Sequence, residues 1–168
     1  MNITMSDVIL LGHATFGILA ILSALWVFVE VLNAREENAS RIRTGVAVVP
    51  ISLCAACALG GYWYLHFYPA EKAIILQGPW TFAHNLFMET KEHLFFITLI
   101  LALYLPIAAA EKLYANASAR TMVLCVTLMI VITGMAIEGA GAIIDHGPKV
   151  ALLQAHVKGA PVKGNRPE

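Results

Sequence analysis

The sequence predicts an all-α integral membrane protein, a four-helix bundle whose helices run up, down, up and down through a lipid bilayer. Of its 168 residues, 59% are hydrophobic and only 13% are charged, about half the charged share of a soluble domain. Four apolar stretches reach the roughly 20 residues that a helix needs to cross a hydrocarbon core. Backbone groups facing lipid must be hydrogen-bonded within their own segment, so each stretch is predicted to be a helix.

Short polar connections and internal prolines define the predicted spans. The connections at residues 34–44 and 111–120 are short, which makes the helices on either side of each one antiparallel neighbours. Pro50 and Pro106 fall inside two of the apolar stretches, where we expect them to kink a helix rather than end it. The four predicted spans cover residues 8–32, 45–67, 93–110 and 122–144.

Two segments outside the spans differ from them in composition. Residues 68–92 mix apolar and polar side chains, so we expect an amphipathic loop in the membrane interface, with its Trp and Tyr residues at headgroup level. The third helix can begin inside this loop, near Thr81. The spans form a domain of residues 1–146, and residues 147–168 are predicted to be a polar tail with a disordered end. A partner subunit is the natural candidate to bind this tail.

Histidines gather at the helix ends that an alternating bundle places at one membrane face. His13 lies near the start of the first span, His66 at the end of the second and His93 at the start of the third. At a helix rise of about 1.5 Å per residue, these three side chains have similar depths. Imidazole is a common ligand of iron, copper and zinc, and two histidines at equal depth on facing helices are what axial ligation of a b-type haem requires. We therefore expect His13 and His66 to share a ligand role.

His93 has a second interpretation. Glu89 lies four residues before it on the same helical face, so the two side chains can form a carboxylate–imidazole pair that orients a ligand or binds a metal. A non-haem metal site built from His13, His66, His93 and Glu89 is therefore an alternative to haem.

Small residues accompany the candidate histidines. Gly17 lies one turn beyond His13, and Gly61 precedes His66 in the second span. Such small-residue faces admit a flat ring, and they are also the usual contacts between membrane helices. Both interpretations stay open for these glycines.

Three further residues are candidates for the same site. Trp80, in the interfacial loop, is expected to exclude water from the edge of a bound ring, and His84 is available to a haem propionate or a quinone oxygen. Glu138 is an ionisable residue inside the fourth span. Ionisable residues are energetically costly inside a membrane and often have a function there. It is either a proton relay or a carboxyl group at a helix contact.

In this pattern of helices and histidines, the chain resembles the small four-helix membrane b-type cytochromes. The resemblance is architectural and covers about residues 7–146, including the segments GHATFG, GGYWYLHFYP and METKEH. It implies haem b and electron transfer between a quinol, menaquinol or ubiquinol, and other subunits of a membrane redox complex, such as a periplasmic cytochrome. Members of this class that carry electrons across the membrane have ligands near both faces. This chain has histidines near one face only, which favours one haem, or two close together, near one surface.

Charge distribution limits the remaining possibilities. The net charge is zero and no long basic block is present, so nothing indicates nucleic-acid binding. A cofactor-free structural subunit, whose loop and tail bind partners, is a third hypothesis. Basic residues flank the helix ends on the histidine-free side, which predicts that this side is cytoplasmic in a bacterial inner membrane and that both termini are periplasmic. These basic residues are Arg35, Arg41, Arg43, Lys112 and Arg120.

Overall fold

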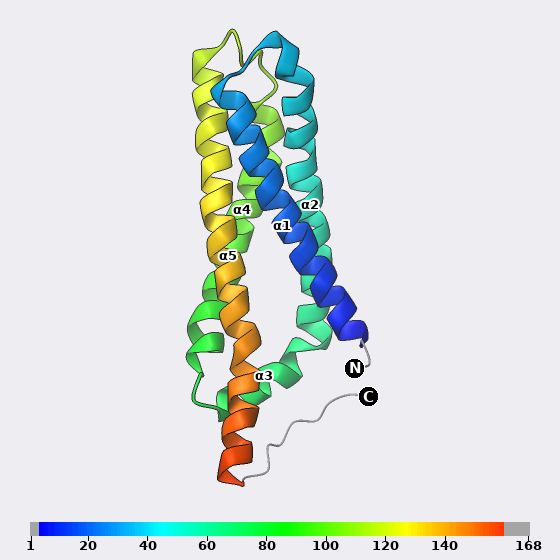
Figure 1. Cartoon of the computed structure of the whole chain (residues 1–168), viewed down its shortest axis with the longest axis vertical. Helices are drawn as coiled ribbons and strands as arrows, with labels where there is room; N and C mark the ends of the chain where they lie inside the picture. The colour runs from blue at the N-terminus through cyan, green and yellow to red at the C-terminus, as the bar shows by residue number, and fades with distance from the viewer. Residues whose placement is uncertain (1–3, 160–168) are drawn as a thin grey trace.

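The computed structural model describes residues 4–159, in which helices are joined by short connections and no β-strand occurs (Figure 1). Four helices in this part of the chain are long and apolar enough to cross a membrane. This confirms the prediction of an all-helical fold with four long apolar helices. The elements in chain order are α1 (Met5–Leu32), the 3₁₀ turn η1 (Glu36–Asn38), α2 (Ala39–His66), α3 (Tyr68–Gln77), the π-helical turn η2 (Ala83–Met88), α4 (Glu89–Ala108) and α5 (Ala117–Lys158).

The ends of α1 are defined by local polar contacts. Thr4 begins the helix with a capping box, in which its hydroxyl accepts from the Asp7 N–H at 3.3 Å and the Asp7 carboxylate accepts from the Thr4 N–H at 2.9 Å. At the other end, Asn38 donates to the Glu30 carboxylate at 2.9 Å, and Arg41 pairs with the same carboxylate at 3.0 Å. These bonds connect the end of α1 to the start of α2.

The half of the molecule around this connection is closely packed. α1 contributes small side chains to the core, and Ala20 and Ala24 are fully buried. Gly45 of α2 lies directly against Val27 of α1, so the two helices approach closely. Between α4 and α5 the Thr98 hydroxyl donates to the Thr133 hydroxyl at 2.8 Å. This half therefore contains both an apolar core and an interhelical polar contact.

The other half is more open, and α3 crosses its base (Figure 1). The C-terminal half of α5 packs on α3 and on η2 through small residues. A Cβ atom on Gly78 would lie 2.4 Å from the Ala151 Cβ, and one on Gly147 would lie 3.0 Å from Ile75. Ile75 is completely buried in this contact. The contact places α3 beneath the space enclosed by the long helices.

The structure differs from the sequence prediction in two segments. Within the predicted loop, residues 68–77 form the separate helix α3, whereas η2 runs directly into α4, in agreement with a third helix that begins near Thr81. α5 continues from residue 144 through Pro148 to Lys158 and ends at Gly159 in the left-handed conformation, φ 64°. In this extension, Gly147 and Ala151 pack against Ile75 and Gly78, at and just after α3. Local composition does not reveal such a contact between distant segments. Residues 160–168, which include most of the expected disordered end, lie outside the described residues.

Candidate functional site

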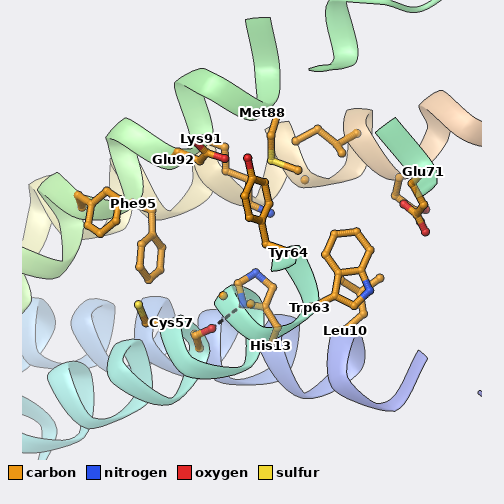
Figure 2. Close-up of a pocket in the computed structure, with 17 residues that line it drawn as sticks. Leu10, His13, Cys57, Trp63, Tyr64, Glu71, Met88, Lys91, Glu92 and Phe95 are labelled. Carbon is orange, nitrogen blue, oxygen red and sulfur yellow. Dashed lines mark hydrogen bonds between the residues drawn. The ribbon is translucent and has the colours of Figure 1, made fainter. Parts of the chain in front are cut away.

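A cavity of about 360 Å³ lies among α1, α2, α4 and α5 in the half of the molecule that α3 closes (Figure 2). Its wall is mainly apolar, and this volume falls within the usual range for small-molecule sites. Tyr64 of α2 and Phe96 of α4 line it and remain 37% and 59% exposed, so the cavity can be reached from the side of the bundle. The lining includes six residues with charged, imidazole or hydroxyl side chains: His13, Tyr64, Glu71, Lys91, Glu92 and Asp145.

His13 has a defined orientation on this wall. Its Nδ1 atom lies 2.8 Å from the carbonyl oxygen of Ala56 on α2. Since a carbonyl oxygen only accepts, the geometry assigns the hydrogen to Nδ1 and leaves the lone pair on Nε2 free. Gly60 provides space for the ring, because a Cβ atom there would lie 2.6 Å from Nδ1. His13 is therefore held ready to accept a proton or to bind a metal through Nε2.

Two further ionisable side chains lie against glycines of neighbouring helices. Glu138 on α5 lies over Gly17 of α1, where a Cβ atom would meet its carboxylate oxygen at 2.6 Å. Lys91 on α4 lies over Gly141 of α5, where a Cβ atom would meet its Nζ at 3.0 Å. At these positions, the small residues accommodate the protein's own polar side chains.

A second, smaller cavity connects Glu138 with His13. It has a volume of about 20 Å³ and is lined by His13, Glu138 and Thr98, among other residues. Its other lining residues are mainly apolar, and its volume is about that of one water molecule. Glu138 also interacts electrostatically with both His13 and Lys91. Glu138, the predicted proton relay, therefore lies beside the smaller cavity, and His13 lines both this cavity and the main one.

Acidic groups line the end of the main cavity that α3 closes. Burial, followed by repulsion from Asp145, raises the pKa of Glu71 on α3, and the positive charge of Lys149 opposes this shift. Burial also raises the pKa of Tyr68, at the start of the same helix. On the facing wall, Tyr64 and Glu92 interact electrostatically. The cavity thus contains several groups that can hold protons.

The structure does not bring the other two ligand candidates to His13. His66 is exposed and outside the cavity, where its ring stacks on Tyr62 with centroids 4.2 Å apart. His93 is also exposed, and its Nδ1 lies 2.7 Å from the carbonyl oxygen of Glu89. In residues 4–159, no group of three or more His, Cys, Asp or Glu side chains is placed to hold a metal ion.

Helix geometry explains why these histidines point away. His66 follows Tyr64 by two residues and His93 follows Lys91 by two, which is a rotation of about 200° around a helix. Tyr64 and Lys91 line the cavity, so the histidines face elsewhere. Similar depth along the helices did not imply a shared direction.

The remaining candidates divide between the cavity and the packing beneath it. Gly61 lines the cavity and has open space where a Cβ atom would lie. His84 is buried, and its Nδ1 lies 2.9 Å from the Tyr68 hydroxyl. Trp80 packs beside Phe82 with ring centroids 5.4 Å apart. His84 and Trp80 therefore support the base and do not line the main cavity.

Sequence reasoning missed Lys91 and Glu92 because, although it allowed the helix to begin near Thr81, it selected neither of them as a site candidate from this segment. Helix α4 begins at Glu89, so both residues lie in its first turn and point toward the cavity (Figure 2). One signal was available. A lysine next to an apolar span and Glu138 inside another are opposite charges that a bundle can bring together.

No family model, curated protein or solved structure matches the chain.

Proposed function

We propose that this chain is an electron-transfer subunit of a membrane redox complex and that its main cavity binds a quinol. The observation that most directly supports quinol binding is the orientation of His13. Its free Nε2 faces an apolar cavity that is accessible from the side of the bundle, through which a lipid-soluble quinol can enter. A quinol hydroxyl would donate to Nε2, and the ring would lie between the apolar walls.

Quinol oxidation releases two protons and two electrons. His13 would accept the first proton at Nε2, with Glu138 near enough to stabilise the resulting positive charge and the charge of Lys91 opposing it. Glu71 and Asp145, toward the base of the cavity, would pass protons to the surface. The electrons would go singly to a one-electron acceptor in an attached redox protein, such as a periplasmic cytochrome.

Quinone binding can be measured through Trp63, which lines the cavity. In a Trp26→Phe/Trp80→Phe variant, Trp63 is the sole tryptophan. A short-chain ubiquinone or menaquinone analogue should quench its fluorescence saturably. His13→Ala should weaken binding about tenfold, because one hydrogen bond to the ligand is lost.

His66→Ala is the matched control, since it removes an imidazole that lies outside the cavity. It should leave the affinity unchanged. Equal affinities in the His13→Ala and His66→Ala proteins, or quenching that never saturates, would contradict a quinol site at His13.

Haem b is a second candidate ligand, favoured by the same His13 tautomer. His13 would supply a nitrogen ligand to the haem iron through Nε2, and His66, which lies outside the cavity in the described structure, would not share this role. Haem would supply one-electron chemistry, while the chain would orient Nε2 through Ala56.

A dithionite-reduced visible spectrum tests this candidate. If haem binds here, sharp α and β bands should be present in the parent protein and in His66→Ala, and absent from His13→Ala. Loss of the bands in both variants would instead support paired ligation, and their absence from the parent protein would exclude haem b from the purified subunit.

The membrane arrangement completes the proposal. The four long helices are suited to a multi-pass protein, and we place them up, down, up and down in a bacterial inner membrane. The basic end containing η1 would be cytoplasmic, and the cavity end, with both termini, periplasmic. The extension of α5 beyond Asp145 would project toward the redox partner.

A further inference from the structure

A third cavity lies at the opposite end of the molecule, remote from His13. Its volume is about 250 Å³, and it lies between the start of α2 and the connection from α4 to α5. In Figure 1 these are the connections at the upper end. No part of the proposed quinol chemistry uses this cavity.

The charged residues around this cavity are not paired with one another. Arg35, Arg43 and Lys112 line it together with Glu36 and Glu111, and no ion pair joins any two of them in the described structure. Three positive and two negative side chains leave an excess of one positive charge. Nearby Arg41 differs, because it is already paired with Glu30 at 3.0 Å. The lining cations are therefore available to an outside anion.

The remainder of the wall is apolar. Ile42 and Leu113 are 4% and 6% exposed, and Tyr114 borders the cavity with 37% of its surface exposed. Exposed apolar side chains continue along the adjoining helices, including Ile107 of α4 and Leu32 of α1. A ligand with a polar anionic head and an apolar body would match a basic cavity that adjoins exposed apolar helix surfaces.

We propose that this cavity binds the headgroup of an anionic phospholipid. The phosphate would be held by Arg35, Arg43 and Lys112, whose donors form charge-assisted hydrogen bonds with phosphate oxygens. Glu36 and Glu111 would accept from headgroup hydroxyls, as in phosphatidylglycerol. The acyl chains would lie along the apolar sides of α1 and α4. This site does not depend on the proposed function of the main cavity.

Thermal unfolding in a neutral detergent tests the proposal. Adding phosphatidylglycerol should raise the unfolding temperature in a saturable, concentration-dependent manner, because a ligand of the folded state stabilises it. Phosphatidylcholine, which has no net charge, should give a much smaller shift. An Arg35→Gln/Arg43→Gln double variant should need at least about tenfold more phosphatidylglycerol for the same shift, since it loses two charged donors.

Arg41→Gln is the matched control, because it removes a positive charge at the same end of the molecule without altering the cavity wall. It should keep the phosphatidylglycerol response, although its basal stability can change. Circular dichroism of each variant verifies that the helices are intact. Equal responses to the two lipids, or equal losses in the control and the double variant, would overturn the proposal. Saturable stabilisation by inorganic phosphate that the double variant abolishes would identify a soluble anion as the occupant instead.

Discussion

At the scale of single residues, one hydrogen bond determines what His13 can do. The contact between Nδ1 and the Ala56 carbonyl determines the tautomer and directs the free nitrogen into the main cavity. His66 and His93 also place Nδ1 near a carbonyl oxygen, but that carbonyl lies four residues earlier on their own helix and both rings are exposed. Only the His13 contact joins two helices, so it connects the geometry of the site to the packing of α1 on α2.

The space that Gly60 leaves for His13 leads to a prediction about substitution. Gly60→Ala would place a Cβ atom 2.6 Å from Nδ1 and force the ring away from Ala56. We expect a stability loss of about 1–3 kcal/mol from overpacking, together with loss of quinone quenching or of any haem bands. Thermal unfolding and the Trp63 titration measure the two effects.

The neighbouring Gly61→Ala is the control for this substitution. A Cβ atom there meets nothing within 4 Å, and alanine favours a helix over glycine by about 1 kcal/mol. Gly61→Ala should therefore be neutral or stabilising and, because its Cβ atom does not meet His13, should leave the contact between His13 and Ala56 intact. If both alanine variants retain ligand equally, Gly60 does not position His13.

At the scale of elements, the π-helical turn determines which residues of α4 reach the cavity. The wider turn of η2 changes the rotation of the chain before α4 begins at Glu89. Met88, Lys91 and Glu92 then line the cavity, while Glu89 and His93 face outward. Apolar periodicity does not predict a single π turn, and η2 packs against α5, which is distant in the sequence.

At the scale of the whole molecule, composition predicted the architecture better than the site. The four spans follow from the length and hydropathy of each segment, which are local properties, and all four are present as helices of sufficient length. The site depends on the direction of side chains around each helix. His13 and Gly61 line the main cavity, and Glu138 lines the small cavity beside it, while the roles predicted for them stay predictions. His66 and His93 were chosen for their depth and Glu89 for its spacing from His93, and the directions of these side chains separate them from His13.

The same dependence on distant contacts applies to the extension of α5, which we predict to be required for the open half of the molecule. Ending the chain after His146 would remove Gly147 and Ala151, the surface on which α3 packs, and would expose Ile75, which is 0% exposed in the intact protein. Exposing this side chain alone should cost about 1.5–3 kcal/mol. We expect a lower unfolding temperature in detergent and a weakened Trp63 titration, because α3 no longer closes the base of the main cavity.

Ending the chain after His156 provides the matched comparison, because the first residue that it removes, Val157, is 78% exposed. This shorter truncation keeps the contacts of Gly147 and Ala151 with α3, so unfolding temperature and quinone affinity should match those of the full chain. Any binding of a redox partner to the end of the chain should be lost in both truncated proteins, since both lack residues 157–168. If the truncation after His146 leaves stability and quinone affinity unchanged, then α3 is held by its connections to α2 and η2, and the extension of α5 serves only partner binding.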